Sequence, residues 1–193
     1  MLPFKTSDGV TRWNPVDKTG CNKAFGHMTV LADDMKYRDL ASGDAGWLIQ
    51  RHGELYAETE GFDATFEPLV AEILVDFMRN RDPQVERAWI AVSGDTRLGS
   101  IFCVKSDDPG VAKLRLFLVE PAVRGLGLGQ LLLDQCITHA RQTGNHTLRL
   151  WTHESHKAAC ALYIKNGFHC TRSVDVQSFG VDLVEQTWEL ELS

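Results

Sequence analysis

The segment over residues 116–133 constrains the fold of this chain more than any other stretch. An apolar run that is typical of a β-strand ends at Pro121, and three alternating glycines between positions 125 and 129 lead into an amphipathic run that predicts a helix. Glycine has no Cβ, so its backbone N–H groups can approach an anion closely, and the positive end of a helix dipole favours negative charge at the same place. Arg124 adds a full positive charge. The segment therefore predicts a binding site for a phosphorylated cofactor.

The spacing of these glycines decides which class of cofactor fits. The dinucleotide fingerprint G-x-G-x-x-G needs its third glycine at position 130, which is Gln130. The P-loop pattern needs a Gly-Lys-Ser/Thr ending, which is also absent. What remains is Arg-x-x-Gly-x-Gly over residues 124–129. This pattern resembles the acetyl-CoA motif of the GNAT N-acetyltransferase superfamily, which directly follows a strand.

A second segment supports the same resemblance. Residues 159–168 read Ala-x-x-Leu-Tyr-x-x-x-Gly-Phe, which is similar to the way the last helix of the family ends. Between the two motifs, residues 148–152 are typical of a strand that follows a helix ending near Gly144. Strand, glycine turn, helix, strand and helix is the order that the family requires.

Outside these motifs, the wording of residues 46–47, 51–53, 178–180 and 186–190 is similar to the acetyltransferase half of fusions between a MarR-type winged helix and a GNAT domain. This similarity covers roughly residues 36–192. The first 28 residues are far fewer than the ~60 to 100 of a winged-helix domain, so this chain alone is not expected to bind DNA. The net charge of −6 also disfavours nucleic acid as a binding partner and makes basic small molecules the more natural ligands.

Composition sets further bounds. With 193 residues, of which 44% are hydrophobic, the chain has the size of one domain with a sizeable core. No apolar run approaches the ~18 residues of a membrane span, and residues 1–4 do not resemble a secretory signal, so a cytoplasmic location is expected. The 5 cysteines form no Cys-x-x-Cys pair, which argues against a zinc site and favours small buried thiols.

We divide the chain into an N-terminal extension, residues 1–28, and a single acetyltransferase domain, residues 29–193. The extension shows no helix or strand period, and residues 26–28, Gly-His-Met, are typical of a cloning junction, so the natural start is either Met1 or Met28. In the domain, Asp44 predicts the cap of a helix that continues through Arg51, and an apolar stripe predicts a second helix over residues 64–80. Strands are expected at residues 29–31, 36–40, 88–92, 98–104, 112–119, 148–152, 169–176 and 185–192. The expected fold is α/β, a GNAT-like mixed and mostly antiparallel sheet of about seven strands with helices on both faces.

The resemblance implies which residues hold acetyl-CoA. The end of the strand before the glycine turn should pair with the pantetheine arm, with the Leu118 N–H near the thioester oxygen, and irregular strand geometry there would free its backbone groups. The amides after Arg124 should bind the pyrophosphate, so Arg124→Ala is expected to weaken cofactor binding without unfolding the domain. The expected cofactor-binding residues are Phe117, Leu118, Val119, Arg124, Gly125, Leu126, Gly127, Leu128, Gly129, Gln130 and His156.

The resemblance also assigns the chemistry. An amine attacks the acetyl thioester, an oxyanion forms, and the thiolate that leaves benefits from a proton. Tyr163 matches the family's tyrosine and is the expected general acid; the other reading is a packing tyrosine that holds the cofactor. His156 replaces an asparagine that many relatives carry. No acid lies on the strand where some relatives carry a glutamate base, and Glu120, His153 and Glu154 at strand ends also suit surface or capping roles, so no general base is assigned.

The acceptor is expected to contact residues 52–62, taken as a loop. The carboxylates at positions 54, 58 and 60 suit an amine, or else form a solvated acidic loop. The expected activity is acetyl transfer from acetyl-CoA to a primary amine of a small molecule or peptide, by direct attack in a ternary complex. The alternatives are an acyl-CoA-binding regulatory domain without turnover and a nucleotide-binding or phosphotransfer protein. A homodimer is compatible with either family reading, and neither a metal nor a membrane partner is expected.

Overall fold

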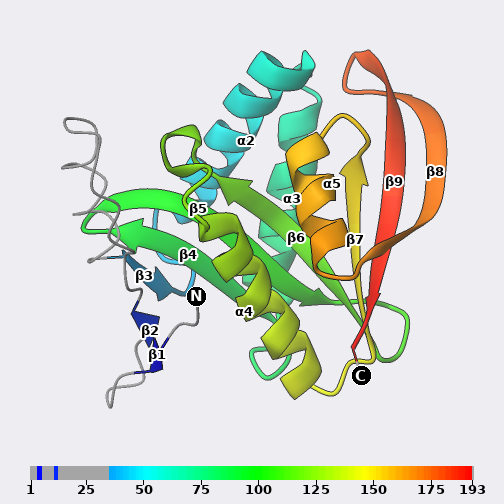
Figure 1. Ribbon diagram of the computed structural model, residues 1–193. Coiled ribbons are helices and arrows are strands. Elements are labelled where there is room, and N and C mark those ends of the chain that lie inside the picture. The colour runs from blue at the N-terminus through cyan, green and yellow to red at the C-terminus, as the bar shows by residue number, and fades with distance from the viewer. Residues whose placement is uncertain (1–3, 6–10, 13–34, 193) are drawn as a thin grey trace, which may run out of the picture.

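A seven-stranded mixed sheet forms the centre of the computed structural model, which describes residues 4–5, 11–12 and 35–192 (Figure 1). In spatial order its strands are β3 (Met35–Arg38), β4 (Arg87–Ser93), β5 (Thr96–Lys105), β6 (Val111–Val119), β7 (Thr147–His153), β9 (Val181–Glu191) and β8 (His169–Ser178). Neighbours in this sheet are antiparallel except β6 and β7, which are parallel. The expected fold class, including the number of strands and their mainly antiparallel pairing, is confirmed.

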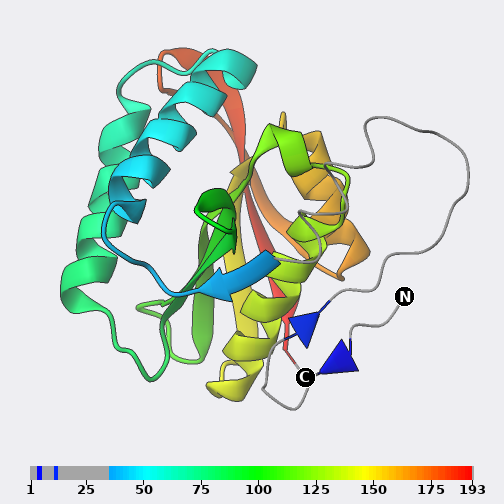
Figure 2. The same ribbon diagram turned by 90° about the vertical axis from the view of Figure 1, so that its left-hand side faces the viewer.

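Helices cover both faces of the sheet. Figure 2 shows α2 (Asp44–Glu60) and α3 (Phe66–Asn80) on one side and α4 (Leu128–Gln142) and α5 (Lys157–Lys165) on the other. Each side has its own core: Leu48, Val70 and Phe102 are buried in the first, and Leu132 and Leu148 are fully buried in the second. The expected stripe on α3 is confirmed, since its apolar residues recur every three to four positions on the face that meets the sheet.

The two parallel strands separate along their length. Pairing of β6 with β7 runs from Val111↔Thr147 to Leu114↔Leu150 and goes no further, although both strands continue. Just beyond this point β6 contains a bulge against β5: Leu116 has a φ of 45°, and the hydroxyl of the buried Ser100 donates to its carbonyl oxygen at 2.6 Å. The carboxyl-terminal half of β6 therefore has an edge that β7 does not cover.

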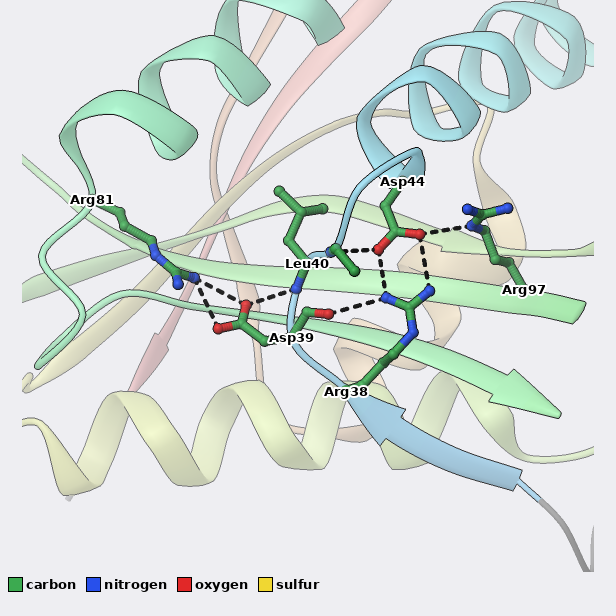
Figure 3. A network of polar contacts seen from close by, with 7 residues as sticks. Arg38, Asp39, Leu40, Asp44, Arg81 and Arg97 are labelled. Carbon is green, nitrogen blue, oxygen red and sulfur yellow. Dashed lines mark hydrogen bonds and ion pairs between the residues drawn. The ribbon is translucent and has the colours of Figure 1, made fainter. Parts of the chain in front are cut away.

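Asp44 anchors the start of α2 to two strands (Figure 3). We expected this carboxylate to cap the helix, but it is the first helical residue, follows Gly43, and is fully buried. It accepts hydrogen bonds from Arg38 Nη2 at 2.9 Å, Arg97 Nε at 2.7 Å and the Ala41 N–H at 2.7 Å. Burial alone would raise the pKa of Asp44, but the bonds from Arg38 and Arg97 outweigh it and lower the pKa to about 2. The helix is thereby tied to β3 and β5.

The helix α2 is longer than the sequence predicted. Residues 52–60, expected in a loop, form its last turns, and the chain leaves the helix at Gly61, where φ is 75°. Gly53 lies where α2 meets α3, and a Cβ there would be 2.8 Å from Glu67 Oε1.

The N-terminal extension contributes one feature to the described residues. β1 (Phe4–Lys5) and β2 (Thr11–Arg12) form a separate antiparallel pair, which the sequence did not predict. The strand expected at residues 29–31 lies outside the described residues. Within the described ranges, none of the helices has both the length and the apolar character that crossing a membrane demands.

Candidate active site

The glycine turn opens directly onto the N-terminus of α4. A short 3-10 helix, η1 (Pro121–Val123), precedes it, and both Gly125 and Gly127 have positive φ, 76° and 90°. A Cβ on either glycine would meet none of the described residues within 4 Å. The first turn of α4 receives no hydrogen bond from a capping side chain. Backbone N–H groups at the positive end of a helix are the groups that commonly hold a diphosphate.

The side chains around this turn have other partners. Arg124 folds back, and its Nε donates to the Val119 carbonyl oxygen at 3.0 Å. The Gln130 amide exchanges hydrogen bonds with Asn166, at 2.7 and 3.1 Å, and so joins α4 to the end of α5. Leu128 is buried in the core on this side and Leu126 packs against it. An anion at this turn would therefore be held by backbone amides more than by these side chains.

The uncovered edge of β6 presents backbone groups beside the turn. The Glu120 N–H donates to Leu98 O at 2.9 Å on β5, and residues of an antiparallel strand alternate in the side to which their N–H groups point. The N–H of Leu118 therefore points toward β5, and those of Phe117 and Val119 point toward the edge that β7 leaves. The expected contact of the Leu118 N–H with a thioester oxygen does not agree with this alternation, which offers its two neighbours instead.

A cleft lies between the helices α2 and α3 and the separated ends of β6 and β7. Its wall includes Tyr56 of α2, Phe117 of β6, Trp151 of β7 and Tyr163 of α5. The end of β6, the helix α5 and the helices α2 and α3 therefore meet at one cleft, although Tyr56 and Tyr163 are more than a hundred residues apart in sequence.

Tyr163, the expected general acid, is buried in the wall of this cleft. Its ring centroid lies 6.4 Å from that of Phe117, and its hydroxyl has no hydrogen-bond partner among the described residues. Burial, and to a lesser extent the nearby Tyr56, raise the pKa of Tyr163 far above its usual value. The phenol is therefore fully protonated at neutral pH.

The sequence reading missed a second tyrosine. Tyr56 stacks on Phe66 at 4.7 Å between ring centroids and meets the ring of His156 edge-on at 5.0 Å. Burial first, and Glu60 second, raise the pKa of Tyr56 to about 12. Had the helix been extended past residue 52, the four-residue spacing from His52 would have placed both side chains on the same face.

His153 was weighed as a general base against a surface or capping role, and the surface role is wrong. It is 1% exposed, and neither ring nitrogen has a hydrogen-bond partner among the described residues. Its ring lies 4.5 Å from that of Trp151 and 5.3 Å from that of Phe62. Burial, and then the neighbouring His156, lower the pKa of His153 to about 4, so its imidazole is neutral at physiological pH.

His156 lies in the cleft and not at the glycine turn. Its Nδ1 is 3.1 Å from the Thr152 hydroxyl, and its Nε2 is 3.6 Å from Glu60 Oε1. Burial lowers its pKa below the usual histidine value. The side chain therefore lines the same cleft as Phe117 and Tyr163.

Most of the carboxylates that the sequence suggested for the site form ion pairs with other side chains. Arg51 holds Glu120 through two bonds, Nε–Oε1 at 2.7 Å and Nη2–Oε2 at 2.8 Å, and also pairs with Glu54. Glu154 is exposed, 3.8 Å from Lys157 Nζ. Among the acids expected to bind the acceptor, at positions 54, 58 and 60, it is Glu60 that contacts a residue of the cleft.

Cysteines and metal ligands add little to this picture. Cys103, Cys136 and Cys160 are buried free thiols, as expected, and Cys170 is exposed. In the ranges that the structure covers, no three histidine, cysteine or acidic side chains gather as a metal ion would require.

Comparison with known proteins supports the same reading. The profile of the acetyltransferase (GNAT) family matches residues 49–168. A mycothiol acetyltransferase of Geodermatophilus obscurus is 33% identical over 107 residues, which cover 51% of this chain and 34% of that protein, so the chain spans about a third of its length. An uncharacterized N-acetyltransferase of Schizosaccharomyces pombe is 30% identical over 119 residues, 60% of this chain and 71% of that protein.

Solved structures share the fold at low sequence identity. The acetyltransferase yncA of Salmonella typhimurium, described as putative and solved with its cofactor acetyl-CoA, has a TM-score of 0.64 at 19% identity and covers 83% of this chain and 95% of its own. A structure described as a putative phosphinothricin N-acetyltransferase has a TM-score of 0.67 at 17% identity, covering 82% and 99%. Together with the family profile, these findings show that the chain belongs to the GNAT family of acetyltransferases.

Proposed function

We propose that this chain transfers an acetyl group from acetyl-CoA to a primary amine by direct attack in a ternary complex. The observation that carries the proposal is the separation of β6 from β7, which places an open strand edge between the glycine turn and Tyr163. When bound, acetyl-CoA supplies an acetyl group activated as a thioester. The acceptor would enter from the side of α2 and α3.

Different residues of this chain would bind the diphosphate, bind the pantetheine arm and donate a proton. The amides from Gly125 to Gln130 bind the diphosphate at the N-terminus of α4. The backbone groups of Phe117 and Val119 pair with the pantetheine arm, which requires the Arg124 side chain to release the Val119 carbonyl oxygen. The amine attacks in its neutral form, and the Tyr163 hydroxyl donates its proton to the sulfur that leaves. The proton that the nitrogen then carries passes to water, from which the phenol is reprotonated.

The domain organisation is part of the proposal. We take residues 29–193 as a single acetyltransferase domain, related in sequence to the acetyltransferase half of MarR–GNAT fusions. The continuous seven-stranded sheet over the described residues from Met35 onward supports a single unit. The role of residues 1–28 is left out of the mechanism.

Free-thiol release during incubation with acetyl-CoA tests the function. The candidate amines are amino acids, polyamines, aminoglycosides and peptides with a free N-terminus. We expect one class to release thiol far above the rate without amine, and acetyl-CoA to raise the melting temperature more than ATP does. Stabilisation by acetyl-CoA without thiol release would support the regulatory alternative, and stabilisation by ATP alone would refute an acetyl-CoA site.

A further inference from the structure

One half-buried cation in the cleft has no counter-charge. Arg115 lies on β6, just before the bulge, and lines both the cleft that contains Tyr163 and an adjoining hollow bounded by Lys113 and Phe179. No carboxylate of the described residues lies within 4.0 Å of its guanidinium, and the guanidinium donates no hydrogen bond to another described residue. Burial lowers its pKa, and no neighbouring carboxylate opposes this effect.

The other half-buried arginines differ in this respect. Each of them forms an ion pair with an aspartate or glutamate: Arg38, Arg51, Arg81, Arg97 and Arg149. The fully exposed arginines need no partner because water solvates them. Removing a guanidinium from water without a counter-charge is costly, so an unpaired one inside a cleft points to an anion that arrives with a ligand.

The cations beside Arg115 have carboxylate partners, so the lack of a counter-charge is specific to Arg115. Lys113 and Arg149 line the same hollow. Lys113 Nζ lies 3.8 Å from Asp107, and Arg149 is held by Asp108 and Glu189, each at 2.6 Å. Glu185 also lines this hollow, but it accepts a hydrogen bond from Trp151 Nε1 at 3.0 Å and forms no ion pair with Arg115. The described residues therefore supply counter-charges to Lys113 and Arg149 but not to Arg115.

We propose that the acceptor carries a carboxylate as well as its amine, and that Arg115 binds the carboxylate while the amine faces Tyr163. This inference rests on the proposed function. The planar guanidinium matches a carboxylate through two parallel bonds. Arg115 is two residues before Phe117 on β6, so one small amino acid could bridge the anion site and the reacting edge. The local charge thus favours an amino acid over the polycations that the acidic composition of the chain suggested.

The test compares acids with their amides. Thiol release is measured for the common L-amino acids and the corresponding amino acid amides, with the unmodified chain, Arg115→Gln and, as the matched control, Lys113→Gln. We expect at least about a tenfold higher kcat/KM for the best amino acid than for its amide, lost in Arg115→Gln and kept in Lys113→Gln. The KM for acetyl-CoA should be the same in all three. Equal rates for acids and amides, or equal losses in the two variants, would overturn the inference.

A binding measurement separates this inference from the proposed function. If no amine releases thiol, the proposed transfer fails, and the anion site is tested by calorimetry with N-acetyl amino acids and N-acetyl amino acid amides on protein saturated with coenzyme A. Tighter binding of the acids that Arg115→Gln abolishes would uphold the site without catalysis. Equal binding of acids and amides would refute it.

Discussion

At the scale of single residues, the account depends most on the Tyr163 phenol. Its hydroxyl lies in the cleft wall without a hydrogen-bond partner among the described residues, so removing the oxygen disturbs no contact of the fold. We predict that Tyr163→Phe lowers kcat roughly 100-fold, the usual effect of losing a general acid, with little change in the Kd for acetyl-CoA. Thiol-release kinetics and calorimetry check the two quantities separately.

Tyr37→Phe is the matched control for this prediction. The Tyr37 hydroxyl is also buried and without a hydrogen-bond partner in the described part of the chain, but it lies on the edge strand β3. Its kcat should stay within twofold of the unmodified chain. If Tyr163→Phe retained full kcat, Tyr163 would be a packing residue that holds the cofactor and not the general acid.

Two buried histidines predict how stability depends on pH. Burial lowers the pKa of both His52 and His153 to about 4, against 6.5 for an exposed histidine. Below pH 6.5 the unfolded chain binds protons that the folded chain refuses, so the free energy of unfolding is fully present above that pH and falls as the pH drops toward 4. The expected loss is about 3 kcal/mol for each histidine.

Urea unfolding at several pH values measures this effect. His153→Gln should flatten the pH dependence between 6.5 and 4, whereas His169→Gln, at an exposed position of β8, should leave it unchanged. If the free energy of unfolding depended on pH equally in both variants, the lowered pKa of His153 would be contradicted. Asp44 is present in both variants, and its stabilising effect is lost mainly below this window, as the pH falls from its unfolded pKa of 3.8 toward the folded value of about 2.

At the scale of elements, the start of α4 can be separated from its end. Gly127 precedes the helix with φ 90° and Gly144 follows it with φ 79°, and a Cβ at either would meet nothing within 4 Å. An alanine at either position strains the backbone by about 1 kcal/mol. We predict similar losses of stability, but loss of acetyl-CoA affinity only in Gly127→Ala, whose methyl group would fill the space above the amides. Calorimetric titration measures the affinity for acetyl-CoA. Equal affinity in both variants would show that the diphosphate does not bind at the start of α4.

A second prediction at this scale concerns the ion pairs that attach α2 to the sheet. Asp44→Asn removes the charge that two arginines share at a fully buried position, and breaking a buried pair costs about 3 kcal/mol. Asp39→Asn, in an exposed pair with Arg81, should cost under about 1 kcal/mol. Urea midpoints of the two variants give the comparison. Similar midpoints would show that Asp44 does not anchor the helix.

Most elements could be predicted because their signals are local. The hairpin of β4 and β5 and the helix α3 follow from alternation, turn residues and a stripe of apolar positions. The end of α2 was wrong for a reason that is not local. Residues 52–60 continue the helix beside α3, with His52 and Leu55 buried, and one sequence does not reveal this packing.

At the scale of the whole molecule, the two halves of the site were predictable to different degrees. The glycine turn is one continuous segment with its own signal, so its backbone conformation followed from the motif. The cleft is assembled from α2, α3, β6, β7 and α5, and the roles of Tyr56, His153 and Arg115 depend on contacts across the fold. Overall charge predicted a basic acceptor, whereas the charge that faces the cleft is positive at Arg115.

The central claim is that one chain binds acetyl-CoA on the open edge of β6 and transfers its acetyl group to an amine. Mass spectrometry of a reaction that contains the chain, acetyl-CoA and the amine panel tests it most directly, with free thiol counted in the same sample. The account predicts an N-acetylated amine and free coenzyme A in equal amounts, and both about 100-fold slower in Tyr163→Phe. Saturation with acetyl-CoA that yields neither product with any amine would contradict it.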